Sequence, residues 1–371
     1  MIKQLEEIEV GSSPAFLRNP YLEWADGEGV PVIEDFGVYL HDVETAPWDR
    51  FGMSGAIVHL KGRGDFISVF LFDLSPGGKS VPQRHLYEQV IYVLSGSGST
   101  NVETPDGQTH TFEWGKGSLF AIPMNVAYRH FNGSGVEPAR LSVTNNFCIM
   151  MNLFRNDGFI FANGYDFTND LFLNNGFAGE GEYVPDPRGL VMRDTNFVAD
   201  IGSAELVAYE KRGPGSATMT YILADTGMHS HCSYIPVGRY KNAHRHGPDY
   251  HIVIVDGEGF SLLWYEGDED FVRIDWTPGW MFAPPDQMYH QHFNTNPDPA
   301  LYLATAMGNE RFPFTETNRQ GKMGIDVSVK DGGTQIDFED QDPRVHGMYL
   351  EALAESGVAC EMTGVPTRAG E

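Results

Sequence analysis

The chain has 371 residues, enough for two ordinary domains, and 41% of them are apolar, as in a typical globular protein. Its formal net charge is −26, from 25 basic and 51 acidic residues, which disfavours nucleic acid and anionic membranes as partners because both are bound by basic patches. No apolar run approaches the roughly 18 residues that span a bilayer, so we expect no membrane segment. We expect no secretory signal either, and three cysteines without metal-like spacing fit a cytoplasmic protein without a disulfide framework.

The first part of the chain predicts an arm followed by a β-domain. Residues 1–40 predict an irregular N-terminal arm, because proline, glycine and acidic residues interrupt any helical period. The segments 41–150 and 201–320 both carry short apolar runs about every eight to twelve residues, separated by turn residues such as glycine. This pattern is typical of an all-β barrel or sandwich, so we expect two β-domains in tandem.

Two further segments lie outside these β-domains. Residues 151–200 are rich in Asn, Gly, Asp and Phe, and predict a linker with one short helix at Asn169–Leu173. The tail, 321–371, is expected to carry one helix over Asp342–Ser356. Its expected packing face consists of Met348, Leu350 and Leu353.

An internal repeat relates the two halves of the chain. The first motif is a glycine, five residues, two polar side chains one residue apart, and a second glycine after an apolar strand. Its two copies are Gly77, Gln83, His85 and Gly96, and then Gly238, His244, His246 and Gly257. The second motif is also present twice, as Gly117, Pro123, Tyr128, His130 and Asn132, and as Gly279, Pro285, His290, His292 and Asn294. The two β-domains are therefore expected to share one architecture.

The second half gathers histidines in a pattern that suits a metal ion. In a regular strand, side chains two residues apart share a face, so His244 and His246 would point to the same side. His290 and His292 are spaced in the same way, 44 residues after the first pair. We expect these two stretches to form two walls of one metal site.

The spacings of both motifs resemble those of the cupin superfamily, over roughly 53–150 and 205–310. That resemblance implies two small antiparallel barrels, each with a central pocket, hence an all-β fold of two cupin barrels with an N-terminal arm, a linker and a short helical tail. It also implies that His244, His246 and His290 are the metal ligands, and that Tyr250 stands where the family has a glutamate ligand. A phenol is a poor ligand unless deprotonated, so we expect a three-histidine site with open positions. In the first half the corresponding residues are Gln83, His85, Gln89 and Tyr128. We expect a degenerate site retained for packing or dimerisation, with weak metal binding by His85 and Gln89 as the alternative.

Other side chains near the motifs each have two interpretations. His292 and Tyr250 are candidate catalytic or ligand-supporting groups, although the counterpart His130 in the first half favours a structural role for His292 equally. His229 and His231 are expected chiefly to pack, with lining of the cavity as the alternative. The remaining candidates for the substrate pocket, each with core or surface placement as the alternative, are Arg245, Gln287, Trp264 and Tyr234.

The ligand set is similar to that of gentisate and salicylate ring-cleaving dioxygenases, and so is the local sequence around His244-Arg245-His246. That resemblance implies an Fe(II) dioxygenase that cleaves a hydroxylated aromatic acid or a similar chelating substrate, with dioxygen as co-substrate. In that family the metal belongs to the N-terminal barrel, whereas here the intact triad is C-terminal. The alternative is a non-oxidative lyase, decarboxylase, isomerase or hydrolase that uses Mn, Ni, Zn or Fe as a Lewis acid. Either way we expect an organic acid as substrate and, by resemblance, a homo-oligomer. An arginine or lysine beside the metal would indicate a carboxylate substrate.

Overall fold

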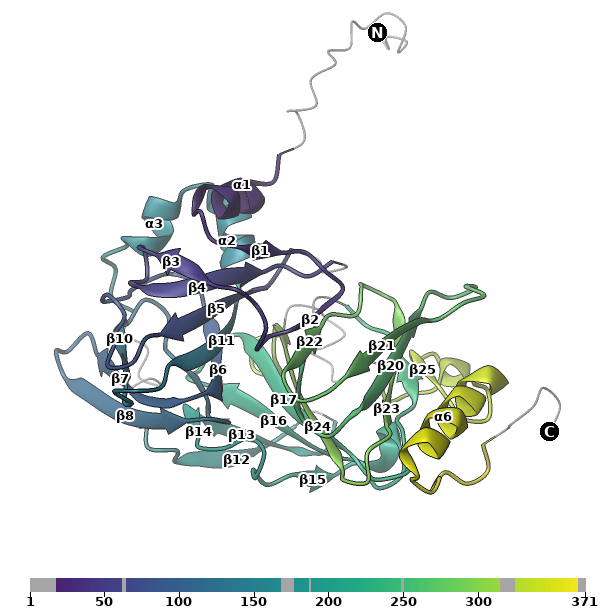
Figure 1. The fold of residues 1–371 in the computed structure, drawn as a ribbon. Coiled ribbons are helices and arrows are strands. Elements are labelled where there is room, and N and C mark those ends of the chain that lie inside the picture. Colours follow the sequence, from purple (N-terminus) through teal and green to yellow (C-terminus); the bar gives the residue numbers. More distant parts are fainter. Residues whose placement is uncertain are drawn as a thin grey trace, which may run out of the picture.

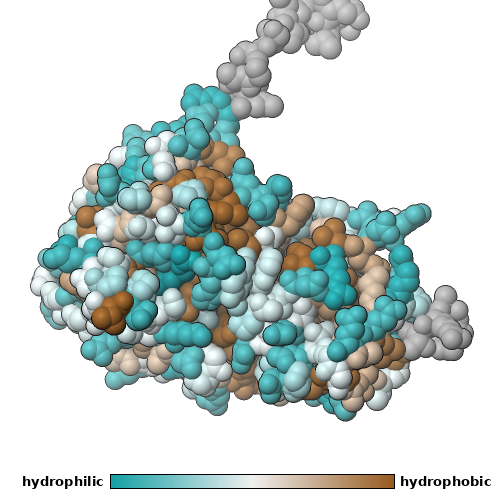
Figure 2. Space-filling model, viewed as in Figure 1, coloured by the Kyte–Doolittle hydropathy of each residue, from teal (hydrophilic) through white to brown (hydrophobic). Residues whose placement is uncertain are grey.

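The computed structural model describes residues 18–61, 65–167, 177–186, 188–247, 250–313 and 324–365. The chain forms two β-barrels side by side, barrel 1 mainly from residues 46–145 and barrel 2 mainly from residues 207–307, with further strands from the arm, the linker and the tail (Figure 1). The predicted all-β class with two tandem barrels and a short C-terminal helix is confirmed. Within the described residues, no helix is long and apolar enough to cross a membrane. Hydrophilic residues cover most of the face seen in Figure 2, in keeping with the excess of acidic residues.

Barrel 1 consists of a larger and a smaller sheet. The larger sheet has the strand order β1 (Val32–Ile33), β4 (Met53–Val58), β5 (Ser68–Leu74), β11 (Ala139–Asn145), β6 (Gln89–Ser95), β9 (Leu119–Ala121) and β14 (Phe197–Val198), with β3 (Ala46–Trp48) paired to β4. The smaller sheet has the order β10 (Ala127–Asn132), β7 (Ser97–Glu103) and β8 (Thr109–Gly115).

Barrel 2 repeats this plan. Its larger sheet has the order β12 (Gly181–Pro185), β13 (Val191–Thr195), β16 (Ala217–Leu223), β17 (Met228–Ile235), β24 (Ala300–Met307), β19 (His251–Asp256), β22 (Trp280–Phe282) and β2 (Gly37–Tyr39), with β15 (Val207–Ala208) paired to β16. Its smaller sheet has the order β21 (Val272–Trp276), β20 (Gly259–Trp264), β23 (Tyr289–Asn294), β18 (Ala243–His244) and β25 (Gln335–Ile336).

The larger sheets are apolar on both faces because one face lines a barrel and the other packs between the barrels. In β5, Phe70 and Phe72 belong to the core of barrel 1, whereas Val69 and Leu71 belong to a cluster shared with Met219 and other residues of barrel 2. This explains why β5 is a near-continuous apolar run. In the smaller sheet of barrel 1, β7 alternates buried and exposed residues because its outer face meets solvent. In barrel 2, β23 is buried throughout, and its Phe293 packs with Tyr349 of the C-terminal helix.

The internal repeat is present in the backbone as well as in the sequence. Each glycine of the motifs adopts a left-handed conformation that other residues rarely take. The paired φ angles are 63° and 68° for Gly77 and Gly238, 82° and 82° for Gly96 and Gly257, and 88° and 94° for Gly117 and Gly279. The motif glycines therefore mark equivalent tight turns in the two barrels.

The N-terminal arm is more regular than the sequence predicted. Pro20–Gly27 forms the helix α1, with Asn19 as its N-cap accepting from the Leu22 amide at 3.1 Å. Trp24 of this helix lies in the core of barrel 1. The arm then supplies β1 to barrel 1 and β2 to barrel 2, where β2 pairs with β22. The described part of the arm is thus more ordered than expected, because two short strands and a capped helix use its apolar residues.

The linker is also built into both barrels. It begins with the helices α2 (Phe147–Phe154) and α3 (Asp157–Phe161), and later supplies β12 and β13 to barrel 2 and β14 to barrel 1. The helix expected at Asn169–Leu173 lies outside the described residues. Two 3-10 turns follow farther along the chain, η3 (Glu210–Arg212) and η4 (Val329–Asp331).

The expected C-terminal helix is present as α6 (Pro343–Ser356), and Asp342 caps it by accepting from the Arg344 amide at 2.9 Å. Its packing face differs from the predicted one. Leu353 is buried as expected, but Met348 is only partly buried and Leu350 is exposed. The buried set is Val345, His346, Tyr349, Ala352 and Leu353. Upstream of this helix, β25 pairs with β18 and so brings the tail against His244.

Candidate metal centre and its cavity

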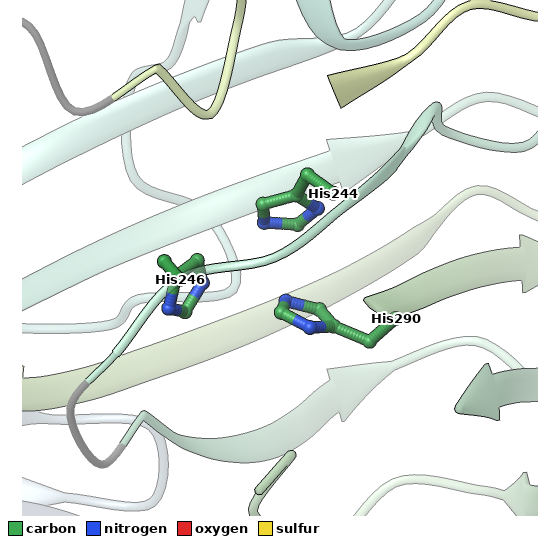
Figure 3. A group of neighbouring side chains, drawn as sticks. All are labelled: His244, His246 and His290. Carbon is green, nitrogen blue, oxygen red and sulfur yellow. The ribbon is translucent and has the colours of Figure 1, made fainter. Parts of the chain in front are cut away.

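Three histidines converge inside barrel 2 (Figure 3). His244 ends β18 and lies opposite His290 of β23, whereas His246 follows in the loop after β18. The ring centroids are 4.1 Å apart for His244 and His290, 4.8 Å for His246 and His290, and 5.1 Å for His244 and His246. One ring nitrogen of each lies within 4.8 Å of the others. The strand is shorter than predicted, but the structure brings together the three side chains that the spacing singled out.

The protonation of these rings suits a divalent cation. The Nδ1 atom of His290 lies 3.1 Å from the carbonyl of Met288, which can only accept, so Nδ1 carries the hydrogen and Nε2 keeps its lone pair. Burial lowers the pKa of His290 to about 4. Burial also lowers the pKa of His244 and of His246 well below the usual value, and the cation Arg212 and the neighbouring histidines add to this effect. All three are therefore neutral near pH 7, which is the form that binds a metal.

Arg212 is hydrogen-bonded to the Nδ1 atom of His244. A guanidinium can only donate, so Nδ1 accepts here and the ring hydrogen lies on Nε2. Ligation of a metal through Nε2 requires that hydrogen to leave this nitrogen. If Nδ1 takes it up, Arg212 must turn away from the ring. Metal binding at His244 is thus linked to the position of this arginine.

Tyr250 occupies the place of the expected carboxylate ligand. Its ring centroid is 4.2 Å from that of His246, and the side chain is buried. Burial raises the pKa of this phenol above its usual value, so it stays protonated and does not offer an anionic oxygen. The described residues place no carboxylate with the three histidines as a fourth ligand.

His244 and His246 of the triad line a cavity, together with residues of the larger sheet and of the tail. The space open to the centre of a water-sized sphere is about 60 Å³, several times the roughly 10–15 Å³ that one water needs. It suits a small polar molecule. The lining consists of Arg188, Tyr209, Arg212, Ala217, Thr218, Thr220, His229, His231, Ser233, Lys241, His244, His246, Tyr250, Tyr302 and Ile325.

Two of the cations in this lining have no carboxylate partner among the described residues. Arg212 is 7% exposed and donates to the Ile325 carbonyl and, at 3.1 Å, to Gln335 Oε1. Lys241 is 2% exposed, donates to the Ser233 hydroxyl and lies 5.2 Å from the centre of the Tyr302 ring. Burial lowers the pKa of Lys241 well below its usual value and that of Arg212 to about 10.

Sequence analysis missed both cations. Arg212 precedes His244 by a long stretch of chain in the turn η3, and no motif marks it. Lys241 lies only three residues before His244, so its nearness to the motif was the one signal available. Arg188 was missed as well, but its charge is balanced because it donates to Asp186 at 2.7 Å and to Glu310 at 3.3 Å.

His229 and His231 line the cavity instead of packing in the core, the less favoured of the two expectations. His229 Nε2 and His231 Nδ1 are 2.8 Å apart. On the other side of His229, Nδ1 lies 3.5 Å from Glu310 Oε2.

His292 lies behind the triad and not on the cavity wall. Its Nδ1 atom is 2.8 Å from the hydroxyl of Ser261, which accepts from the indole of Trp276 at 3.0 Å. The same arrangement occurs in barrel 1, where His130 is 2.7 Å from Thr100 and Trp114 donates to Thr100 at 2.9 Å. Since the barrel without the triad keeps this network, the structure favours the structural role for His292.

The four other side chains proposed for the pocket lie elsewhere. Arg245 points outward, with Nη1 2.8 Å from Glu266 and its guanidinium over the Tyr289 ring. Trp264 stacks on Tyr289 and meets Phe271 edge to face. Gln287 is exposed, and Tyr234 packs beside the apolar cluster between the barrels. None of the four belongs to the cavity lining. Arg245 and Gln287 lie in loops, where side chains do not alternate between two faces as they do in a strand. Trp264 lies on the outer face of β20.

The corresponding site in barrel 1 is closed by hydrogen bonds. The Tyr128 hydroxyl is 2.9 Å from His85 Nε2 and 2.9 Å from Gln89 Nε2, whereas Gln83 donates to the Val81 carbonyl. His85 also stacks on Tyr87 with centroids 3.5 Å apart. Among the described residues of this barrel no group of metal-binding side chains converges. His85, Gln89 and Tyr128 hold one another, and Gln83 bonds to the backbone.

Comparison with known proteins agrees with the barrels. Residues 70–149 match the family model described as Cupin domain. No curated protein matches the chain. Solved structures of oxalate decarboxylase are similar. One aligns at a TM-score of 0.48 with 13% identity, covering 74% of this chain and 78% of that one. The Bacillus subtilis enzyme at pH 4.6 aligns at 0.47 with 12% identity, covering 74% and 77%. A single-site variant of the B. subtilis enzyme aligns at 0.47 with 13% identity, covering 82% and 88%.

The match to the Cupin domain supports the cupin superfamily, and the second barrel has the same plan as the matched one. The narrower resemblance to gentisate and salicylate dioxygenases gains no support from these comparisons.

Proposed function

We propose that barrel 2 holds one divalent metal ion on His244, His246 and His290, and that the protein is an enzyme acting on a small organic acid without oxidation, as a decarboxylase, lyase or isomerase does. The observation that carries this proposal is the pair of buried cations, Arg212 and Lys241, on the wall of the same cavity and without a carboxylate partner among the described residues. We therefore prefer an enzyme that uses the metal as a Lewis acid to a dioxygenase.

Arg212 and Lys241 lack a counter-ion among the described residues. A buried charge without a counter-ion costs several kcal/mol, and proteins normally pair or neutralise it. Arg212 and Lys241 have neutral partners only, while the chain as a whole carries a charge of −26. An anion that enters the cavity would therefore gain a charge-assisted hydrogen bond from Arg212, and a second one from Lys241, whose proton burial disfavours and the anion would restore. A compound with one or two carboxylates matches this pocket.

The donor set fits the implied metal. Three neutral imidazoles suit Mn, Fe, Ni or Zn, and a bound ion of this kind acts as a Lewis acid that polarises a carboxylate or carbonyl oxygen. The chain's own residues would bind and orient the substrate. Arg212, once released from His244, is positioned for one carboxylate, and Lys241 for a second oxygen. Tyr250 keeps its phenolic hydrogen and can donate it to a substrate oxygen.

A dioxygenase remains the second candidate because of one observation. Tyr250 replaces the carboxylate ligand, so three neutral rings would leave the ion its full charge and several open positions. Such a site can hold a bidentate substrate and dioxygen together. The aliphatic part of the cavity lining is Ala217 and Ile325 and the aromatic part is Tyr209, Tyr250 and Tyr302. An aromatic ring would therefore meet mostly side chains that carry a polar group, which fits this candidate less well.

The two candidates separate in one reconstitution experiment. The full chain would be loaded anaerobically with Fe(II), Mn(II) or Zn(II) and given small aliphatic acids and hydroxybenzoates. The proposal expects turnover of an aliphatic acid without oxygen uptake. Oxygen consumption with Fe(II) alone, coupled to loss of a hydroxybenzoate, would establish the dioxygenase instead. Arg245→Met is the matched control, since this arginine flanks the triad in sequence but points outward. The predicted homo-oligomer would be tested on the same sample by sedimentation.

A further inference from the structure

The cavity contains a chain of titratable groups that the proposed function does not use. His229 and His231 project from β17, where alternation puts both on one face. Their neighbours on β24 are Ala306 and Ala304, whose small side chains leave room for two rings. Glu310 follows two residues after Gly308, so the carboxylate comes from the same paired strands.

The position of Glu310 is fixed from both sides. The side chain of Asn309 donates to the carbonyls of Thr226 and Met228 at 2.7 and 3.2 Å, which anchors the turn. Arg188 donates to Glu310 at 3.3 Å. Burial raises the pKa of Glu310, but contact with His229 and the charge of Arg188 outweigh this effect and hold the pKa at about 2, so this group is a carboxylate that can only accept hydrogen bonds.

These contacts determine which nitrogen of each ring carries its hydrogen. The carboxylate of Glu310 lies 3.5 Å from His229 Nδ1, so that nitrogen is the one with the hydrogen. In a neutral ring, Nε2 of His229 is then an acceptor. It lies 2.8 Å from His231 Nδ1, which must therefore donate. His231 is left with a lone pair on Nε2.

The ring of His231 belongs to the cavity wall. His231 lines the cavity, keeps accessible surface, and has ring contacts with Tyr250 and Tyr302, both cavity residues. Among the described residues, no hydrogen bond is made to its Nε2 atom. The ring lies apart from the triad, since the three nitrogens that converge belong to His244, His246 and His290.

Resting on the proposed function, we infer that His231 is the proton acceptor of this site, and that His229 and Glu310 are positioning residues that hold it in the Nδ1–H form. In the step, an O–H or C–H bond of the bound acid breaks, its electron pair stays on the substrate, and Nε2 of His231 gains the proton. The positive charge that forms on His231 is compensated by Glu310 through His229. The proton returns to the product from the same nitrogen.

The test reads the tautomer directly and needs no substrate. The full chain would be labelled with ¹⁵N, loaded with Zn(II), and the ring nitrogens of His231 assigned by long-range ¹H–¹⁵N correlation. The wild-type protein should show His231 as Nδ1–H. His229→Phe removes the acceptor and should shift His231 to Nε2–H, whereas His229→Gln supplies an amide oxygen and should restore Nδ1–H.

The outcomes separate this inference from the metal site. His231 found as Nε2–H in the wild type, or unchanged in His229→Phe, would overturn the relay. If His229→Phe fails to fold, the wild-type spectrum alone decides. Zinc stoichiometry is measured on the same samples. If the wild-type protein shows the expected tautomers but binds no zinc, the proposed metal centre is refuted and the arrangement of Glu310, His229 and His231 stands.

Discussion

Replacing Arg212 with methionine should stabilise the protein without ligand and abolish binding of organic anions. Burial lowers the pKa of Arg212 from 12.5 to about 10. At about 1.4 kcal/mol per pKa unit, holding this charge in the cavity costs on the order of 3 kcal/mol of unfolding free energy. In the zinc-loaded protein, where Arg212 has turned away from His244, methionine fills similar space without a charge and gives up the bonds to the Ile325 carbonyl and Gln335, each worth about 1 kcal/mol. The net expectation is a gain of about 1 kcal/mol.

The assay is urea unfolding of both proteins, with Zn(II), in the presence and absence of malonate as a small dicarboxylate probe. Malonate at about 100 times its dissociation constant should stabilise the wild type by about 2.7 kcal/mol. Arg212→Met removes one partner of a buried charge pair, which weakens binding by about 2 kcal/mol or more, at least roughly 30-fold. The same malonate concentration should then stabilise this variant by less than about 1 kcal/mol.

Arg245→Met is the matched control, with the same chemical change one residue from His244. Its ion pair with Glu266 is partly exposed and should contribute about 0–1 kcal/mol, and malonate should stabilise this variant as it does the wild type. The reasoning would be refuted if Arg212→Met lowered the unfolding free energy by about 3 kcal/mol and retained the full malonate effect. Arg212 would then be a structural cation and not part of an anion site.

Two further predictions concern the rest of the chain. Burial lowers the pKa of His85 and of His130 to about 3 and that of His290 to about 4, so between these values and about 6.5 the unfolded chain binds protons that the native state does not. The contribution of these buried histidines to stability is therefore complete above pH 6.5 and falls as pH drops. The unfolding free energy measured in urea should be lower at pH 5 than at pH 7 by about 2 kcal/mol for each such histidine. Equal urea midpoints at the two pH values would contradict the burial of these rings. Tyr128→Phe removes the hydroxyl shared by His85 and Gln89 and should lower the unfolding free energy by about 1–3 kcal/mol, measured by thermal unfolding. The zinc stoichiometry should not change. Unchanged stability would show that this network contributes nothing to barrel 1.

The parts of the structure that the sequence predicts best are those where one local rule has no competitor. The motif glycines could be found because their turns require positive φ, as at Gly96 and Gly257. The triad followed from spacing even though the strand stopped at His244, because the pairing of β18 with β23 places His244 opposite His290 whatever the loop does.

The features that the sequence did not predict have a different physical origin. The arm's helix α1 is only eight residues long, too short for a periodicity signal, although Asn19 followed by Pro20 is a recognisable N-terminal signal. Arg212 and Lys241 could not be predicted as cavity residues, because their placement depends on tertiary contacts. The Arg212 partner Gln335 comes from a tail strand more than a hundred residues later, and no local pattern connects the two.

The central claim is that barrel 2 binds one divalent metal through three histidines while barrel 1 binds none. The most direct test is the metal content of the full chain, measured by mass spectrometry after loading with Zn(II) and desalting, for the wild type, His290→Ala and His85→Ala. The account predicts one zinc per chain for the wild type and for His85→Ala, and none for His290→Ala. Zinc that persists in His290→Ala, or that is lost in His85→Ala, would contradict it.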